Sequence, residues 1–250
     1  MINPDLSDIE LSLSEYKRYS RHLLLPQVQI EGQKRLAKSK ILCVGAGGLG
    51  SSSLLYLVAS GIGHITILDN DFVDISNLQR QVIHNTSYLN FSKVESAENY
   101  LLKFNTNCTI ETQQTQLNMS NIAELIASQD LVIDGSDNLN TRYLIDEYCY
   151  LLSKPWIYGA IFQFEGQVSL FNYKGGPRYQ DLYPRQSMVG SELSCSEGGV
   201  IGVLPGIIGA IQATESIKVI LGIGDVLSGY LLLVNTLTFQ FKKVCNRIDL

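Results

Sequence analysis

The stretch KILCVGAGGLGSSSLLYLVASGIGHITILD, from Lys40 to Asp69, decides the fold. Two short apolar runs, 40–44 and 64–68, are typical of buried strands, and the apolar periodicity of 51–60 between them predicts a helix. Strand, glycine turn, helix, strand and acidic residue follow one another in the order of the dinucleotide-binding unit of a doubly wound sheet. We therefore expect an α/β fold built on a Rossmann-like, doubly wound sheet.

Each glycine of the turn has a physical task. Gly45 permits the tight turn, Gly47 lets the backbone approach a phosphate, and Gly50 lets the helix pack closely on the strand. The start of the helix offers unpaired N–H groups and a partial positive charge to an anion. Asp69 follows about 20 residues later, where a carboxylate can accept hydrogen bonds from ribose hydroxyls. The pattern predicts a nucleotide site without saying which nucleotide, and a turn used only for packing stays open.

Composition narrows the classes of function. The chain has 250 residues, a hydrophobic fraction of 45% and a net charge of −5, with no block of Lys or Arg. This argues against sequence-independent binding of nucleic acid or of an anionic membrane. The most apolar segment, 200–223, contains glycines, a proline and helically spaced polar residues, which indicates a buried helix rather than a membrane span.

The five cysteines are scattered singly and form no CxxC pair: Cys43, Cys108, Cys149, Cys195 and Cys245. This distribution is typical of a reducing compartment and argues against a disulfide framework. Residues 1–13 lack the basic start and apolar stretch of a signal peptide. We expect a cytoplasmic protein in a bacterium, or a protein of the plastid stroma if the gene is organellar.

The rest of the chain continues the alternation and then changes pattern. Further helices are predicted at 13–25, 30–37, 93–104, 120–128 and 139–152, and further strands at 109–115 and 130–134. After Pro155 a strand is predicted at 156–160, and the alternating strand at 164–171 and two more within 230–242 look antiparallel. A long loop, 175–199, lies between them, and loops of this length are usually functional or mobile. We expect one domain, 1–250, with N-terminal helices at 1–38 and a nucleotide-binding half at 39–155.

Polar residues follow two of the predicted strands where doubly wound sheets place ligands. Residues 70–81 follow one strand and include Arg80, and 135–138 follow another. Asp137 can cap the next helix or hold Mg²⁺ on nucleotide phosphates, and spacing does not separate these uses. Lys93 can be a first-turn surface lysine, and Arg21 can belong to a solvated basic face shared with Arg18.

Six motifs together resemble the ThiF/MoeB/HesA adenylyltransferase family, the bacterial-type relatives of ubiquitin-activating enzymes. They are Arg-Tyr-Ser-Arg at 18–21, the glycine turn, Asp-Asn-Asp at 69–71, Ser-Asn-Leu-Gln-Arg-Gln at 76–81, Lys-Val at 93–94 and Asp-Asn at 137–138. The resemblance runs from about residue 14 to about residue 242, and Asn-Leu-Gln-Arg-Gln is its most specific part.

The resemblance implies binding of ATP and Mg²⁺ and of the C-terminal glycine of a ubiquitin-like sulfur carrier, held by the half at 156–250. The products would be a carrier acyl-adenylate and pyrophosphate, in molybdenum cofactor biosynthesis or, alternatively, in the thiamine pathway. The implied ATP-binding residues are Gly45, Gly47, Gly48, Gly50, Asp69, Ser76, Asn77, Leu78, Gln79, Arg80, Lys93, Asp137 and Asn138. The implied catalytic residues are Arg21, Arg80, Lys93 and Asp137, with Asp137 on Mg²⁺ and Arg21 reaching the neighbouring subunit of a homodimer.

The chemistry explains why such residues would be needed. A carboxylate must attack an α-phosphate that is itself negatively charged, so cations must neutralise both partners. No general base is required, because a C-terminal carboxyl is already ionised at neutral pH. Catalysis then consists of positioning and charge stabilisation.

The sequence departs from the family pattern in its cysteines. Relatives carry a zinc site of two CxxC pairs, whereas Arg178 and Asp181 occupy the places of the first pair and Cys245 stands alone. We therefore expect no structural zinc, with the loop held by other contacts. Cys195 matches a position where some relatives use a thiol to take the carrier, which requires a lowered thiol pKa; a loop cysteine that adenylation does not need is the alternative.

Two rival functions share the glycine turn. An NAD-dependent oxidoreductase would need a His or Tyr placed for hydride chemistry, and would not need Arg80, Lys93 and Asp137 together. A non-catalytic half of a heterodimeric activator would typically have lost the ATP-contacting residues.

Overall fold

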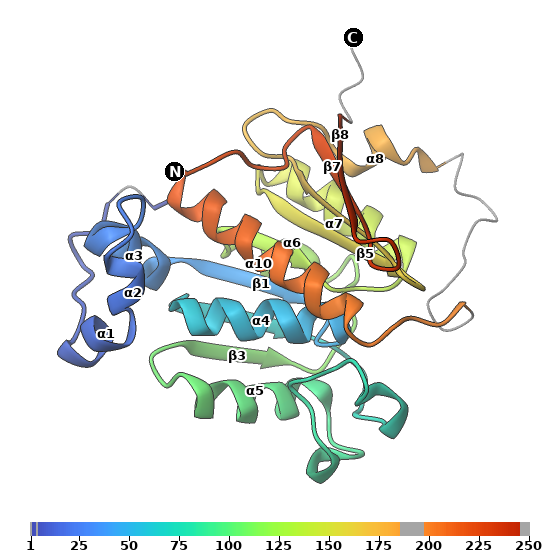
Figure 1. The fold of residues 1–250 in the computed structure, drawn as a ribbon, viewed down its shortest axis with the longest axis horizontal. Helices are drawn as coiled ribbons and strands as arrows, with labels where there is room; N and C mark the ends of the chain where they lie inside the picture. The colour runs from blue at the N-terminus through green and yellow to red at the C-terminus, as the bar shows by residue number, and fades with distance from the viewer. Residues whose placement is uncertain (1, 4, 186–197, 246–250) are drawn as a thin grey trace.

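The computed structural model describes residues 2–3, 5–185 and 198–245, and one mixed β-sheet organises them (Figure 1). Within these ranges the sheet has eight strands in the order β3-β2-β1-β4-β5-β6-β7-β8. The strands are β1 Lys40–Val44, β2 His64–Leu68, β3 Thr109–Gln113, β4 Leu131–Asp134, β5 Trp156–Phe162, β6 Glu165–Phe171, β7 Tyr230–Asn235 and β8 Gln240–Cys245. Strands β1 to β5 pair in parallel, and β5 to β8 pair antiparallel. The predicted α/β sheet, parallel first and antiparallel later, is confirmed.

Helices cover both faces of the sheet because its central strands are apolar on both sides. The helices are α1 Leu13–Arg18, α2 Ser20–Leu23, α3 Gln29–Lys38, α4 Gly48–Ser60, α5 Lys93–Phe104, α6 Ile122–Ala127, α7 Leu139–Leu151, α8 Tyr179–Leu182 and α10 Leu204–Leu221. In β1, Ile41 and Cys43 pack into the core under α3, α4, α5 and α10, while Leu42 and Val44 pack against α6 and α7. The two clusters leave the carboxyl ends of the parallel strands free for a site.

Helix α10 is the one helix of the described residues that is long and apolar enough to cross a membrane. It is instead the central helix of one core layer, with 61% of its apolar window buried inside the protein. Gly209 lies against Leu49 and Ser52 of α4, so the two helices approach closely. The expected buried helix in 200–223 is confirmed, and it runs from Leu204 to Leu221.

Several boundaries differ from the sequence prediction: α6 is shorter than the expected 120–128, and α8 lies within the expected loop 175–199. Two further differences have a visible physical cause. The helix expected at 13–25 breaks into α1 and α2 at Tyr19, whose buried hydroxyl accepts a hydrogen bond from Asn105 Nδ2 at 2.9 Å. A long-range contact of this kind is not visible in local periodicity. Helix α4 begins at Gly48, three residues before the predicted start at Ser51, because the glycine turn already supplies its first turn.

We expect Gly209→Ala to lower the stability of the protein by about 1–3 kcal/mol, because overpacking a close helix crossing forces backbone shifts. An added Cβ would lie 2.6 Å from the Leu49 carbonyl oxygen and 2.7 Å from Ser52 Cβ. The matched control is Gly206→Ala on the same helix, where the nearest atom is 3.9 Å away. It should be neutral or stabilise by up to about 1 kcal/mol through helix propensity. Urea denaturation of both variants tests this; equal midpoints would contradict the close crossing.

Candidate functional site

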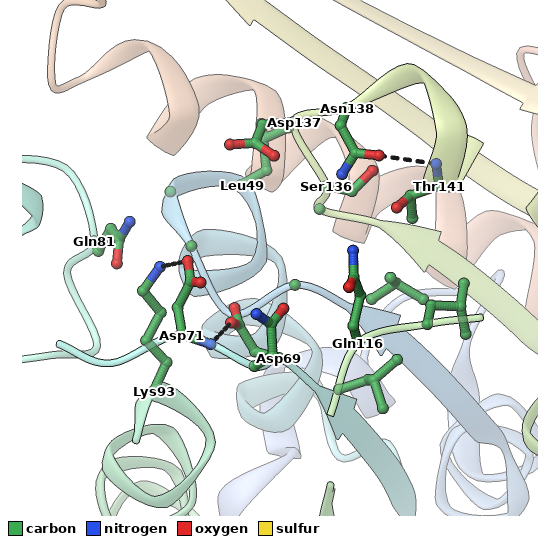
Figure 2. Close-up of a pocket in the computed structure, with 18 of the residues that line it drawn as sticks. Leu49, Asp69, Asp71, Gln81, Lys93, Gln116, Ser136, Asp137, Asn138 and Thr141 are labelled. Atoms are coloured by element: carbon green, nitrogen blue, oxygen red, sulfur yellow. Dashed lines mark hydrogen bonds and ion pairs between the residues drawn. The ribbon is translucent and has the colours of Figure 1, made fainter. Parts of the chain in front are cut away.

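A polar cavity of about 390 Å³ opens at the carboxyl ends of β1, β2 and β4, where the sequence predicted a ligand (Figure 2). Three carboxylates and three cationic side chains line it together with the glycine turn. Its lining residues are Val44, Gly45, Gly47, Gly48, Leu49, Leu68, Asp69, Asn70, Asp71, Arg80, Gln81, Lys93, Thr115, Gln116, Leu117, Gly135, Ser136, Asp137, Asn138, Thr141, Arg142, Ile161 and Val200.

The glycine turn holds β1, α4 and the end of β4 in close backbone contact. Gly45 has a φ of +97°, and a Cβ there would lie 2.8 Å from the Gly135 carbonyl oxygen. A Cβ on Gly50 would collide with the Gly45 carbonyl oxygen. Gly47 caps α4 with its amino end beside the cavity, so the unpaired N–H groups of that end are available to an anion.

Asp69 lines the cavity, and both of its carboxylate oxygens accept hydrogen bonds from backbone N–H groups. Oδ2 accepts from Ala46 N at 2.7 Å, and Oδ1 accepts from Asp71 N at 2.8 Å. The carboxylate therefore braces the glycine turn against the end of β2. The ribose contact expected of Asp69 stays a prediction.

The cations of the cavity come from three different elements. Lys93 is 5% exposed at the first residue of α5, and its Nζ lies 2.7 Å from Asp71 Oδ2. Arg80 is half-buried and donates from Nη1 to the Ser76 carbonyl at 3.1 Å. Both lie beside the turn, so an anion held there would meet positive charge from more than one side.

Arg142, which the sequence analysis did not select, forms a buried ion pair at the base of the cavity. Its Nε lies 3.4 Å from Asp134 Oδ2, and its Nη2 donates to the Ser136 carbonyl at 3.1 Å. Burial raises the pKa of the Asp134 carboxyl, while Arg142 and hydrogen bonds from Ser136 oppose that rise. A buried pair of this kind is costly to break from one side only, so Arg142 is a fixed positive charge of the cavity.

Asp137 and Asn138 have different tasks in the structure. Asn138 caps α7, because its Oδ1 accepts from Thr141 N at 2.9 Å. The alternative that Asp137 caps this helix is therefore wrong. The exposed carboxylate of Asp137 instead lines the cavity, within the same loop (Figure 2).

Asp137 is a suitable ligand for Mg²⁺ brought in by a nucleotide, since Mg²⁺ takes one or two carboxylates and completes its shell with phosphate oxygens and water. Within the described ranges, no group of three or more His, Cys, Asp or Glu side chains is arranged to hold a metal. A resident metal cage is thus not part of the described site, and Mg²⁺ remains a prediction.

The structure brings most but not all of the expected residues to the cavity. Those lining it are Gly45, Gly47, Gly48, Asp69, Arg80, Lys93, Asp137 and Asn138. Gly50 packs behind the turn, and Ser76, Asn77, Leu78 and Gln79 lie outside the lining, in and after the 3₁₀ turn Ile75–Asn77. That turn is held by Asp74, which accepts from Ser76 N and Oγ at 2.8 and 2.6 Å. Direct contacts of these five residues with ATP stay predictions.

Several lining residues were missed by the sequence analysis. Gln81, which the motif at 76–81 included without a role of its own, lines the cavity, and its buried Oε1 has no hydrogen-bond partner (Figure 2). Gln116 and Leu117 follow β3, and the rule that ligands lie at carboxyl ends of parallel strands would have selected them. Arg142 had a weaker signal, one helical turn after the cap at Asn138.

Arg21 is exposed on α2 and does not line the cavity. Its neighbour Tyr19 packs against Gly61, which ends α4 at the opposite end from the glycine turn. A helix of 13 residues is about 20 Å long. Figure 1 shows α1, α2 and α3 grouped together. Because α2 lies one α4 length from the glycine turn, Arg21 does not reach the cavity of its own chain.

The segment of Arg178 and Asp181, which stand in the places of the first cysteine pair of the family pattern, is held by an ion pair. Arg178 Nη2 lies 3.1 Å from Asp146 Oδ2, and Tyr179 N donates to Asp146 Oδ1 at 2.8 Å. Burial raises the pKa of Asp146, and these contacts oppose that rise. Cys195 lies outside the described residues.

One family model and many known proteins match the sequence of this chain. The model of the family described as "ThiF family" matches residues 19–248. A "Probable molybdopterin-synthase adenylyltransferase" of Porphyra purpurea is 53% identical over 233 residues, which cover 93% of this chain and 61% of the relative. "Adenylyltransferase and sulfurtransferase MOCS3" of Culex quinquefasciatus is 43% identical and covers 94% of this chain and 54% of the relative. The chain thus spans less than two thirds of the length of these relatives.

Solved structures agree in fold. The selenomethionine form of PaaA has a TM-score of 0.80 at 23% identity, and covers 96% of this chain and 77% of that one. Escherichia coli MccB, crystallised with ATP, has a TM-score of 0.79 at 21% identity, and covers 91% of this chain and 71% of that one.

We expect Asp71→Asn to strengthen the binding of tripolyphosphate, in the absence of divalent cations, by about 3- to 10-fold. The substitution frees Lys93 and removes from the cavity a negative charge that repels the anion. Asp74→Asn is the matched control, since Asp74 lies on the same segment outside the cavity lining and Asn also caps turns. Calorimetric titration in EDTA measures both. Weaker binding by Asp71→Asn would mean that the carboxylate serves the anion site directly.

Proposed function

The chain belongs to the ThiF family, and we propose that it adenylates the C-terminal glycine carboxylate of a ubiquitin-like sulfur carrier with ATP. The carrier we propose is of the molybdopterin-synthase type, and the products are the carrier acyl-adenylate and pyrophosphate. The observation that carries the proposal is one cavity that joins the glycine turn, Arg80, Lys93 and Asp137. The names of relatives from Porphyra purpurea and Pyropia yezoensis support the molybdopterin pathway.

The described residues suit an adenylyl transfer that needs no general base. The amino end of α4 would bind phosphate oxygens through its N–H groups, and Arg80 and Lys93 would neutralise the charge that the carrier carboxylate meets. Mg²⁺, when bound with ATP, would add positive charge at the phosphates, with Asp137 as its protein ligand. Pyrophosphate would leave into the same positive field.

Lys93 must change partner for this step. In the described structure its Nζ is paired with Asp71 at 2.7 Å. An incoming phosphate offers the buried ammonium more negative charge than one exposed carboxylate, so we expect the pair to open when ATP binds. Asp71 would thus hold Lys93 in place before the nucleotide arrives.

We propose that the protein works as a homodimer in which Arg21 serves the partner's cavity. The position of Arg21, one α4 length from its own glycine turn, supports an action across an interface and not within one chain. Exposed apolar side chains beside the cavity, Phe72 and Ile75 among them, are 57% and 63% exposed, and a second subunit would cover such surface.

We propose that the half at 156–250 binds the carrier through the tips of its hairpins. Phe164 is 40% exposed, and Leu237 and Phe239 are 69% and 80% exposed. Thr236 N donates to the Phe164 carbonyl at 2.9 Å, so the β5–β6 and β7–β8 hairpins present these side chains together. Strand β8 is also a free sheet edge of the described residues, to which a partner strand can add.

The rival functions have less support. Among the described lining residues there is no His, Tyr or Cys to serve hydride chemistry, which disfavours an NAD-dependent oxidoreductase. The retained cations disfavour a non-catalytic half of a heterodimer. Activation of the thiamine-pathway carrier uses the same chemistry and is the second candidate. The single, mostly buried cysteines support a reducing compartment, either bacterial cytoplasm or plastid stroma.

We expect the purified chain to catalyse ATP–pyrophosphate exchange only when a carrier with a C-terminal glycine is added. Arg80→Ala and Lys93→Ala should each lower the exchange rate by about 100-fold, the usual cost of removing one charge-stabilising donor. Lys103→Ala, an exposed cation at the other end of α5, is the control and should leave the rate unchanged. Comparing the molybdopterin and thiamine carriers identifies the pathway. Exchange that survives both cavity substitutions would refute the mechanism.

We expect Arg21→Ala and Arg80→Ala to be inactive alone and to restore about one quarter of the activity when mixed in equal amounts. Half of the dimers would then be mixed, and each would hold one cavity with both arginines. Exchange after subunit mixing, with chromatography to verify the dimer, measures this. No recovery in a verified mixed dimer would place Arg21 outside the partner's site.

A further inference from the structure

We propose that His84 is a positioning residue that holds the glycine turn in its phosphate-binding shape through a hydrogen bond to the backbone carbonyl of Ala46. The proposal rests on the proposed use of this turn for ATP. His84 does not line the cavity, so its effect would pass through the turn.

Both polar backbone groups of Ala46 are held by side chains that come from elsewhere in the chain. Its N–H donates to Asp69 Oδ2 at 2.7 Å, and its carbonyl accepts from His84 Nε2 at 2.9 Å. Ala46 is fully buried at the centre of the turn, between Gly45 and Gly47. The two peptide groups that flank Ala46 are therefore fixed, although its neighbours Gly45 and Gly47 have great conformational freedom.

The contact determines the state of the imidazole. A carbonyl oxygen only accepts, so Nε2 of His84 carries a proton. Nδ1 lies 2.9 Å from Ser96 Oγ, which donates to it when the ring is neutral. Burial lowers the pKa of His84 and Lys93 acts in the same direction, while the Ala46 carbonyl and Asp69 oppose them. The ring at neutral pH is thus the neutral Nε2–H tautomer.

His84 joins the three elements that build the anion site. Through Ala46 it contacts the turn, and through Ser96 it contacts α5, the helix that begins at Lys93. Its own backbone N–H donates to the Gln81 carbonyl at 3.0 Å, within the segment that carries Arg80. His84 therefore joins the turn to α5 through its side chain and to the segment of Arg80 through its backbone. Misplacement of a site by about 1 Å is costly to transition-state binding.

The test compares ATP affinity with stability in four proteins. His84→Ala should weaken ATP binding at least about 10-fold, because the Ala46 carbonyl would keep only the 3.4 Å hydrogen bond from Ser51 Oγ and the nucleotide would have to order the loosened turn. His84→Gln keeps a donor at the Nε2 position and should stay within about 3-fold of the wild type. Leu101→Ala, a buried apolar change on α5 away from the cavity, should lower the unfolding temperature without changing ATP affinity.

The outcomes separate the two proposals. If the wild type binds no ATP, the proposed function fails. If the wild type binds ATP and His84→Ala binds it equally well, or loses affinity only as Leu101→Ala does, the positioning role is overturned. Nitrogen-15 NMR of wild-type His84 gives a second measurement that does not depend on a folded variant. A neutral Nε2–H ring at pH 7 is expected, and an Nδ1–H tautomer would overturn the proposal.

Discussion

The close backbone contact between the β1–α4 turn and the end of β4 is the constraint on which the site depends. Gly45, Gly50 and Gly135 bring three backbone segments so near that a Cβ on Gly45 or Gly50 would meet the carbonyl oxygen of a neighbouring segment. The amino end of α4 therefore opens directly over the end of the sheet. The three cations of the cavity are placed relative to that fixed point by the segment after β2, by α5 and by α7.

Acidic and basic side chains lie close together in the cavity. It holds three exposed or half-buried carboxylates, Asp69, Asp71 and Asp137, and two cations beside the turn, Arg80 and Lys93, while Arg142 is paired with the buried Asp134. Without a ligand, Asp71 pairs with Lys93 and Asp134 pairs with Arg142. Asp69 instead accepts from backbone N–H groups, and Arg80 donates to the Ser76 carbonyl. A phosphate-bearing ligand with its own divalent cation can replace these pairings, which suits a site that must bind and release strongly charged molecules.

Local sequence pattern predicted the bounds of helices and strands correctly where each residue type had a single structural role. The strands 40–44 and 64–68 and the helix 93–104 have their predicted bounds, because continuous apolar runs and helical periodicity report burial directly. The break of the first helix at Tyr19 and the capping of α7 by Asn138 were not foreseen. Both depend on which of several suitable polar groups a long-range neighbour selects, and a single sequence does not contain that choice.

The sequence by itself determined the layered α/β sheet, the glycine turn and the charged residues that follow its strands, since spacing and residue type suffice for these. The tertiary structure alone decided that Lys93 pairs with Asp71, that Arg142 is buried against Asp134, and that His84 holds Ala46. It also set Arg21 apart from its own cavity. The physical reason is that these relations join residues far apart in the chain, and only the packing of the sheet and its helices brings such residues together or keeps them apart.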